Sequence, residues 1–449
     1  MANLLHRSDA IFYYGMNDQF LIRGLGGKKK LKGIIAVSGA KNAALKAMAS
    51  SILFKDTLAT QNVPNIEDVK RMSDLLRELG CDVKKKNSHT YIFTCGNNLK
   101  TDLSSEISKR MRSSIVLSGP LLARFGEVSF PHPGGCVIGE RPIDFFIDGF
   151  RKMGATVSIK GGPSKKAYVI RAPKKGLYGA TIFLKTPSVT GTETLMMAGI
   201  LANGTTVIQN AALEPEIKDV ADFLVKCGAN ITGAGTTTIT IKGGPLLSAR
   251  GKIYTTMPDR IEAGSFIILG ALGAKTLRVE NCNPNHITAL IDTLRTAGVS
   301  LKVGNKSVTV SSSKRGSQFN MVSIKTHEYP GFPTDLQAPM IVLLTQAKGE
   351  AIVFETIFEG RLNYTESLVN MGADITPMDP HRVLVKGPAV LRGKTLESPD
   401  LRAGLAFIIA ATIAKGNSTI HSVYNIDRGY ERIEERLKAI GVDIKRVSD

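Results

Sequence analysis

The chain has 449 residues, of which 43% are hydrophobic, and a formal net charge of +19 at pH 7. Its length predicts about two or three domains, each able to bury a core. The longest apolar runs, such as residues 403–414, are too short to span a bilayer. Residues 1–16 lack the apolar core of a signal peptide, so we treat them as an N-terminal extension and expect no membrane insertion.

The basic excess suits nucleic acid, an anionic membrane or small anionic substrates. Lysine and arginine run to triplets at most, tryptophan is absent and aromatic residues make up only 6% of the chain. This is a poor composition for a base-stacking surface, so we favour small anionic substrates and expect no nucleic-acid partner. The sequence does not indicate any protein partner or oligomeric state.

The five cysteines are scattered without a CxxC pair, and the seven histidines show no metal-ligand spacing. We therefore expect no disulfide framework, no metal site and no cofactor. Cysteines of this kind are typical of a reducing compartment, which predicts a cytoplasmic protein.

One pattern recurs six times along the chain: an amphipathic helix pattern ends at a glycine, and a short β-like run follows. These glycines are Gly80, Gly154, Gly228, Gly298, Gly372 and Gly441, at intervals of 74, 74, 70, 74 and 69 residues. Glycine readily adopts the positive φ that ends a helix. A near-constant period over the whole chain predicts one supersecondary unit repeated six times.

Each unit also has an upstream helix pattern that is apolar on nearly all sides, as in residues 266–274 and 407–416. Such a helix is buried, whereas the amphipathic one lies outside. Six units could form a solenoid or two globular domains, and the buried helices favour the second arrangement. We predict an α/β fold of two inside-out barrel domains, with three units each, buried helices and outer sheets.

The domain boundaries follow from the repeat. We place the first domain at residues 42–250 and the second at 17–41 together with 251–449, with the first strand (residues 20–25) pairing in the last unit. The cleft between the domains is then the expected ligand site.

Two irregularities interrupt the repeat. Unit two contains an extra Pro/Gly-rich loop, residues 131–142, which is either a binding loop or a simple connector. The starts of several buried helices carry cations, although a cation at a helix N-terminus is unfavourable by roughly 0.3–1 kcal/mol. These cations either surround an anionic substrate or pair with carboxylates. They are Lys41, Arg112, Arg260 and Arg402. Ser188 and Asp259 at similar positions are expected to cap their helices.

Eight stretches resemble the enolpyruvyl transferases, and in particular those that act on UDP-N-acetylglucosamine. They are SGAKNAAL (38–45), PGGCVIGERPID (133–144), GTTVIQNAALEPEI (204–217), PDRIEAGSF (258–266), PGFPTDLQA (330–338), ETIFEGR (355–361), DLRAG (400–404) and IDRGYERIEERL (426–437). The resemblance runs from about residue 20 to the C-terminus. It implies the same fold, two domains of three units each.

The resemblance also implies an activity: transfer of the enolpyruvyl group of phosphoenolpyruvate to the 3-hydroxyl of UDP-N-acetylglucosamine, by addition and elimination, with release of phosphate and without a metal. This reaction is the first committed step of peptidoglycan synthesis, which places the chain in cell-wall biogenesis, cell shape, the cell cycle and cell division. By the same resemblance, Cys136 is the general acid and a target of fosfomycin-type epoxides. Asp335 is the base, and Lys41 and Arg402 are catalytic cations.

The remaining site residues come from the same resemblance. Asn42 and Arg141 join Lys41 and Arg402 around phosphoenolpyruvate. Arg361 is a further cation near the reaction centre, unless it forms a salt bridge with Glu355 or Glu359. The nucleotide-sugar site comprises Arg112, the turn Arg141, Pro142, Ile143, Asp144 and Phe145, and also Ser188, Val189 and Ile357.

Two positions depart from the family pattern. Thr186 and Pro187 stand where many members have a lysine near the diphosphate, with Lys185 one residue away. Tyr329 stands where many members have a histidine. The alternatives to the implied function are a related enolpyruvyl transferase acting on shikimate 3-phosphate and a non-catalytic paralogue that binds a nucleotide sugar.

Overall fold

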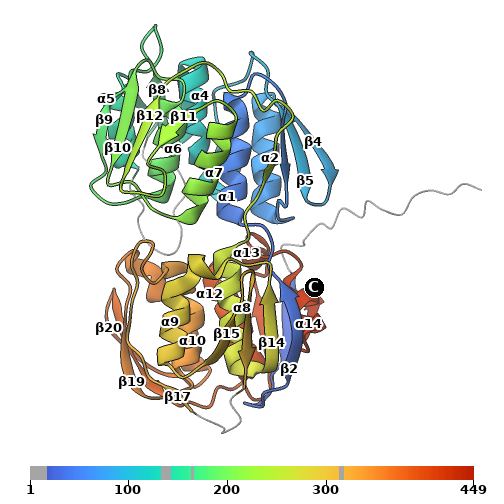
Figure 1. Ribbon diagram of the computed structural model, residues 1–449. Coiled ribbons are helices and arrows are strands. Elements are labelled where there is room, and N and C mark those ends of the chain that lie inside the picture. The colour runs from blue at the N-terminus through green and yellow to red at the C-terminus, as the bar shows by residue number, and fades with distance from the viewer. Residues whose placement is uncertain (1–17, 133–142, 163–165, 313–317, 449) are drawn as a thin grey trace, which may run out of the picture.

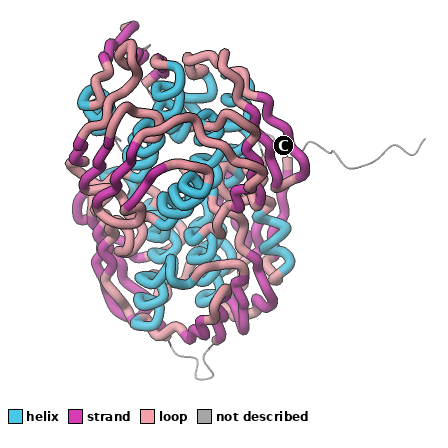
Figure 2. The backbone as a smooth tube through the Cα atoms, turned by 45° about the horizontal axis from the view of Figure 1, so that its top comes forward, coloured by secondary structure: helices cyan, strands magenta, loops and turns pink. Residues whose placement is uncertain are grey.

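The computed structural model describes residues 18–132, 143–162, 166–312 and 318–448. The chain forms two lobes, one above the other in Figure 1, and each lobe has its own hydrophobic core. One core draws its residues from 44–254, and the other from 20–37 together with 261–444. Figure 2 shows that helices fill the interior of the molecule while strands lie on its outside.

The first lobe contains three units and one further strand, which lies where the chain passes back to the second lobe. Unit one comprises α1 (Lys41–Ser50), β3 (Leu58–Gln61), α2 (Glu67–Leu79), β4 (Asp82–Asn87) and β5 (Thr90–Thr94). Unit two comprises α3 (Ser105–Arg110), η2 (Arg112–Leu117), α4 (Ser118–Phe125), β6 (Glu127–Pro131), α5 (Asp144–Lys152), β7 (Thr156–Lys160) and β8 (Ala167–Arg171). Unit three comprises β9 (Thr181–Phe183), α6 (Val189–Gly199), β10 (Thr205–Gln209), α7 (Pro215–Lys226), β11 (Asn230–Thr232) and β12 (Thr238–Lys242), followed by β13 (Ile253–Thr255).

The second lobe begins with β1 (Gln19–Arg23) and β2 (Leu31–Ala36). Unit four comprises α8 (Arg260–Gly273), β14 (Ala274–Glu280), η4 (Pro284–Ile287), α9 (Thr288–Thr296), β15 (Ser300–Val303) and β16 (Ser307–Ser311). Unit five comprises β17 (Phe319–Asn320), β18 (Ile324–Lys325), η5 (Thr334–Leu336), α10 (Gln337–Leu344), β19 (Ala347–Phe354), η6 (Glu359–Leu362), α11 (Thr365–Asn370), β20 (Asp374–Asp379) and β21 (Arg382–Gly387). Unit six comprises β22 (Thr395–Glu397), α12 (Leu401–Ile413), β23 (Asn417–His421), α13 (Tyr424–Asp427), α14 (Ile433–Ala439) and β24 (Asp443–Val447).

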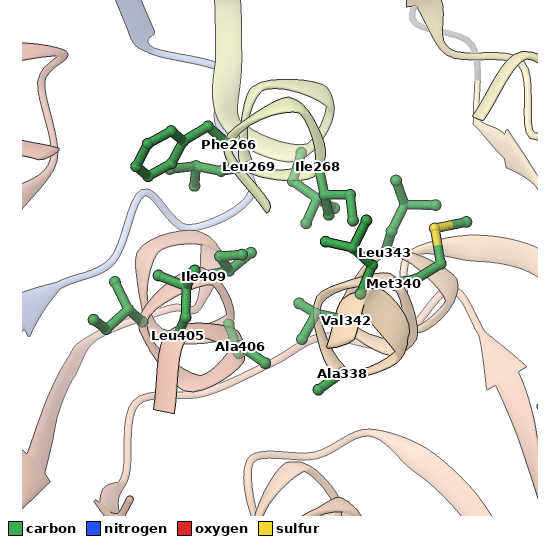
Figure 3. Close-up of a cluster of buried hydrophobic side chains, with 14 of the residues drawn as sticks. Phe266, Ile268, Leu269, Ala338, Met340, Val342, Leu343, Leu405, Ala406 and Ile409 are labelled. Atoms are coloured by element: carbon green, nitrogen blue, oxygen red, sulfur yellow. The ribbon is translucent and has the colours of Figure 1, made fainter. Parts of the chain in front are cut away.

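The helices expected to be buried are buried. Every residue of α8 is buried, and so is every residue of α12 except Leu401. In Figure 3, Ile268 of α8, Leu343 of α10 and Ile409 of α12 lie around one centre. Full burial of such a side chain contributes about 1.5–3 kcal/mol, so these three helices form the centre of the second lobe.

The outer layer is made of separate sheets that share one pattern. In five of them a parallel pair is followed by two antiparallel strands, as in the order β11-β12-β10-β9. β1 lies between β23 and β24, as expected for the first strand. The strand before α1 and the strand before α8 are exchanged between the lobes: β2 pairs with β14, and β13 pairs with β3. The two crossings therefore lie side by side, where Gly39 bridges Pro258.

The six repeat glycines end the outer helices as predicted. Their φ angles lie between 84° and 109°, in the region where a Cβ would be strained. The chain turns sharply at each of them and enters the next strand.

The expectation of no disulfide framework has one exception, since Cys81 and Cys95 form a disulfide with a Cα–Cα distance of 4.4 Å. The two residues are 14 apart in sequence, but β4 and β5 are antiparallel and place Asp82 opposite Thr94. Cys227 and Cys282 are free and buried.

In the described ranges, no helix is both long and apolar enough to cross a membrane. No group of three or more His, Cys, Asp or Glu side chains there is placed to hold a metal ion.

Candidate active site

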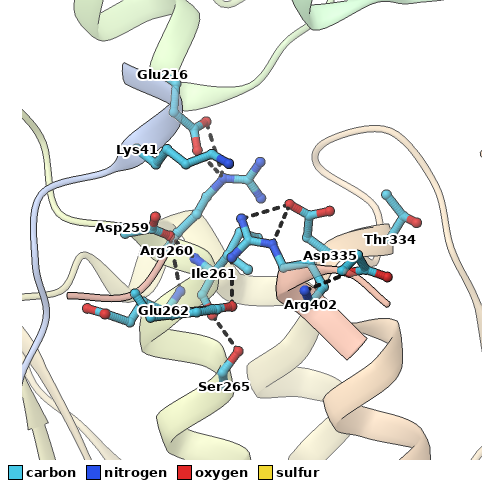
Figure 4. A network of polar contacts seen from close by, with 12 residues as sticks. Lys41, Glu216, Asp259, Arg260, Ile261, Glu262, Ser265, Thr334, Asp335 and Arg402 are labelled. Carbon is cyan, nitrogen blue, oxygen red and sulfur yellow. Dashed lines mark hydrogen bonds and ion pairs between the residues drawn. The ribbon is translucent and has the colours of Figure 1, made fainter. Parts of the chain in front are cut away.

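Asp335 connects two arginines, Arg361 and Arg402, within the polar network drawn in Figure 4. It lies in η5, directly before α10, and its side chain is 28% exposed. Arg361 donates from Nη2 to Oδ1 at 2.7 Å, and Arg402 donates from Nε to Oδ2 at 3.0 Å. Two fixed guanidinium groups therefore hold an ionised carboxylate that solvent and small ligands can still reach.

Arg402 is fixed by further contacts at the start of α12. Asp400 caps this helix by accepting from the backbone N–H groups of Arg402 and Ala403. Arg402 Nη1 donates to the hydroxyl of Tyr430 at 2.7 Å. Burial lowers the pKa of Arg402, but Asp335 and Tyr430 outweigh it, so the pKa lies above its usual value. Burial also raises the pKa of Tyr430 to about 12.

A second carboxylate, Asp68 of α2, lies between cations of both lobes. Lys41, the first residue of α1, donates from Nζ to Oδ2 at 2.8 Å, and Arg428 of the second lobe donates from Nε to Oδ1 at 3.0 Å. Burial raises the pKa of Asp68, but the two cations lower it by more than that. The pKa of Asp68 therefore lies below its ordinary value. Burial lowers the pKa of Lys41; Asp68 opposes this, whereas Arg428 and Arg402 add to it.

A second charged contact across the lobes joins Arg260 of α8 to Glu216 of α7, with Nε donating to Oε1 at 3.0 Å. The guanidinium also lies over the ring of Tyr329, 5.5 Å from its centroid. A cavity of about 250 Å³ beside this pair is lined by Arg260, His286 and Tyr329, among others. The departure to tyrosine at position 329 therefore places a phenol ring at this cavity.

A larger cavity of about 370 Å³ lies at the chain crossing and is lined by Gly39, Asn62, His89, Glu431 and Arg436, among others. None of the predicted site residues lines it. We therefore do not assign it to the active site.

The predicted nucleotide-sugar residues that the structure describes in the first lobe come from the starts of η2, α5 and α6, and α6 packs against both η2 and α5. Ser188 caps α6 by accepting from the N–H of Gly191, as predicted. A Cβ at Gly191 would lie only 2.4 Å from the ring of Phe145, so glycine there lets α5 and α6 meet closely. Asp144 is exposed in the first turn of α5, and Arg112 begins η2.

The other predicted residues are placed as follows. Ile143 is buried, whereas Asn42, Val189 and Ile357 are half-buried. The backbone N–H of Ile357 donates to Glu355. Cys136, Arg141 and Pro142 lie outside the described residues, as does the extension 1–16.

Three of the cations at helix starts have a carboxylate partner in the structure. Each pairs with a carboxylate distant in sequence: Lys41 with Asp68, Arg260 with Glu216, and Arg402 with Asp335. These carboxylates offset the unfavourable position of a cation at the positive end of a helix. Asp259 caps α8 as predicted.

The alternative partners considered for Arg361 were wrong. It pairs with Asp335 rather than with Glu355 or Glu359. Glu355 instead accepts from Thr326, Thr334 and two backbone N–H groups.

Several site residues were missed from the sequence. Asp68 carries no local signal there, since it looks like any first-turn acid of an amphipathic helix. Glu216, Arg428 and Tyr430 lie inside the quoted stretches 204–217 and 426–437, so these motifs already contained the signal.

Known proteins share this architecture. The enolpyruvyl transferase NikO from Streptomyces tendae superposes with a TM-score of 0.83 at 22% identity, covering 97% of this chain and all of that one. EPSP synthase from Acinetobacter baumannii gives 0.72 at 18% identity, covering 96% of this chain and all of that one. The fold is therefore that of the enolpyruvyl transferases.

Sequence comparison is more specific. The sequence model described as EPSP synthase (3-phosphoshikimate 1-carboxyvinyltransferase) matches residues 25–437. Proteins named UDP-N-acetylglucosamine 1-carboxyvinyltransferase from Koribacter versatilis and Desulforapulum autotrophicum are each 42% identical over 96% of this chain, and over 97% and 100% of their own lengths. The chain belongs to the EPSP synthase family of enolpyruvyl-transferring enzymes.

Proposed function

We propose that the chain transfers the enolpyruvyl group of phosphoenolpyruvate to the 3-hydroxyl of UDP-N-acetylglucosamine and releases phosphate. The observation that carries the proposal is the clustering of cations where the lobes meet. Four cations lie there around two carboxylates that they contact. The cations are Lys41, Arg361, Arg402 and Arg428, and the carboxylates are Asp68 and Asp335. A small substrate carrying a phosphate and a carboxylate suits such a site.

The helix starts strengthen this match. Lys41 opens α1, and Arg402 lies in the first turn of α12. Backbone N–H groups at a helix N-terminus favour an anion. Asn42 lies beside Lys41 and would contact the same substrate.

In the addition step, the sugar hydroxyl oxygen bonds to C2 of the enolpyruvyl group while an acid delivers a proton to the methylene carbon. Asp335 is ionised and partly exposed, so it would accept the hydroxyl proton. We assign the acid to Cys136, because a thiol of ordinary pKa keeps its proton near neutrality. In the elimination step a proton leaves the former methylene carbon and the phosphate departs, which restores the double bond.

The nucleotide sugar would bind to the first lobe across Arg112, Asp144, Phe145, Ser188 and Val189, with Ile357 approaching from the second lobe. Lys185, which is exposed near the start of α6, would stand in for the lysine missing from positions 186 and 187. The cavity lined by Arg260 and Tyr329 lies in the second lobe, across the junction between the lobes from these residues.

This reaction would place the chain in peptidoglycan synthesis, and through it in cell-wall biogenesis, cell shape and cell division. We propose the cytoplasm as its location because its substrates are soluble phosphorylated metabolites. The cysteine argument no longer supports that location, since Cys81 and Cys95 are paired.

The test is phosphate release from phosphoenolpyruvate with one of two acceptors. We expect release with UDP-N-acetylglucosamine and none with shikimate 3-phosphate. Release only with shikimate 3-phosphate would support the related transferase instead. Binding of UDP-N-acetylglucosamine without turnover would support the non-catalytic alternative.

A further inference from the structure

A buried ion pair in the first lobe has no part in the chemistry above. Lys46 of α1 and Glu193 of α6 lie 3.2 Å apart, between Nζ and Oε2, and their side chains are 5% and 0% exposed. The surrounding core is apolar, and α1 contributes small buried residues such as Ala43, Ala44 and Ala47 to it. The pair therefore lies deep inside the lobe.

Stability alone does not explain such a pair. Removing two charges from water costs several kcal/mol for each ion, and well-packed apolar residues of similar size are often equally stabilising. What a buried ion pair supplies that an apolar contact does not is a defined partner and separation.

Each member of the pair follows a proposed substrate contact by five residues on its own helix. Lys46 follows Lys41, and Glu193 follows Ser188. Five residues of α-helix span about 7.5 Å, so the pair lies well within reach of both helix starts. η2 and α7 each pack against both α1 and α6, so the pair connects helices that also share neighbours.

The start of α6 faces the junction of the lobes. Thr192 accepts from the backbone N–H of Ala212, which leads into α7, and Glu216 at the start of α7 reaches Arg260 of the second lobe. Lys41 contacts the second lobe indirectly, through Asp68 and Arg428. Both helix starts therefore open on the proposed site.

We propose that Lys46 and Glu193 are positioning residues whose ion pair holds the first turns of α1 and α6 at a fixed separation, so that the two substrates bound there meet in a reactive geometry. This inference rests on the proposed function for the identity of those substrates. A misplacement of about 1 Å between reacting groups can slow a reaction about 100-fold, so a small shift between the helices matters.

Several charged and titratable groups lie near Glu193. Lys46 faces it from α1, Glu216 and Glu214 from α7 and the segment before it, and Tyr254 from β13. α4 and α5 present Gly119 and Gly149 to α6. Burial raises the pKa of Glu193 to about 7; Lys46 opposes the rise, and Glu216 and Glu214 add to it. The charge on the pair is therefore expected to change near neutral pH.

The experiment compares the wild-type protein with the double variant Lys46→Met/Glu193→Leu. We expect kcat for phosphate release to fall about 10- to 100-fold, while the affinity for UDP-N-acetylglucosamine alone and the melting temperature change little. We also expect the wild-type kcat to decline as the pH is lowered through about 7, and this limb to be absent from the double variant. Replacing a purely structural pair would change neither the kcat of the folded protein nor its pH profile.

The matched control is the exposed pair Arg171–Glu127 on β8 and β6 of the same lobe. Arg171→Met/Glu127→Leu is expected to leave kcat unchanged. Wild-type kcat and an unaltered pH profile in the Lys46/Glu193 variant would overturn the proposal. If that variant does not fold, Glu193→Gln, which keeps the side-chain size, provides the same comparison.

Hydrogen–deuterium exchange separates this inference from the proposed function. In the double variant, amides in the first turns of α1 and α6 should exchange faster, and those of α8 in the other lobe should not. This holds whatever the substrates are. If the wild-type protein releases no phosphate, the proposed function fails, and unchanged exchange at both turns would overturn the positioning role independently.

Discussion

Arg428 of the second lobe donates to Asp68 of the first lobe at 3.0 Å, and the Asp68 side chain is only 1% exposed. The other carboxylate oxygen accepts from Lys41. One buried carboxylate therefore links the lobes and partly neutralises the cations that we assign to phosphoenolpyruvate.

Asp68→Asn should destabilise the protein because Lys41 and Arg428 would then face each other without an anion between them. We expect the free energy of unfolding to fall by about 3–5 kcal/mol, the cost of breaking a buried pair. Urea denaturation measures this. Added phosphate should restore part of the loss, since it can take the place of the carboxylate. Asp74→Asn on the same helix, which breaks an exposed pair with Arg77, is the control and should cost little.

Arg402→Lys should lower kcat/KM although the charge is retained. Arg402 contacts Asp335 through two nitrogens and Tyr430 through the third, and an ammonium group cannot reproduce that fork. Losing hydrogen bonds to a charged group costs about 1.5–3 kcal/mol, which corresponds to roughly 10- to 150-fold in kcat/KM. Steady-state kinetics measure kcat/KM for this variant and for the control Arg382→Lys, which changes an exposed arginine. Equal losses in both variants would contradict a specific role.

Asp335→Asn should remove the proposed base. We expect kcat to fall by about 10²–10⁴, the usual contribution of general base catalysis. Calorimetric titration with UDP-N-acetylglucosamine should still show binding, because the first lobe supplies most of the proposed contacts. Asp379→Asn, at the end of β20 and paired with Arg382, serves as the control. Retention of more than a tenth of the wild-type kcat would reassign the base.

Cys136 lies outside the described residues, so its role is tested by chemistry. Phosphate release should collapse in Cys136→Ala and survive in part in Cys136→Asp, since a carboxyl group can also deliver a proton. A fosfomycin-type epoxide should add to the thiol, as detected by intact mass and peptide mapping. Full activity of the alanine variant would end the assignment.

Glu193 should make stability depend on pH. Its pKa is raised from 4.5 to about 7 by burial, so between these values the folded protein keeps a proton that the unfolded chain has lost. The free energy of unfolding therefore falls as the pH rises through this window, by about 3 kcal/mol in total. Urea denaturation of wild type and Glu193→Gln from pH 4.5 to 8 isolates this contribution as their difference. A flat difference curve would show that burial does not perturb Glu193.

Much of the fold could be predicted from local patterns in the sequence alone. The six helix-ending glycines, the buried helices and the caps at Ser188 and Asp259 were all read from neighbouring residues. Each depends on periodicity or on contacts within a few positions, and such interactions leave a signature in any short stretch of chain. The sequence motifs also predicted the family, because eight whole stretches match its pattern.

Only the tertiary structure decided which distant residues meet. It exchanged β2 and β13 between the lobes, paired Cys81 with Cys95, and gave Lys41, Arg361 and Arg402 their carboxylate partners. A cation at a helix start looks the same in sequence whether its counterion is a substrate or a carboxylate 67 positions away. Charge pairing depends on distance in space, and packing of the six units sets that distance.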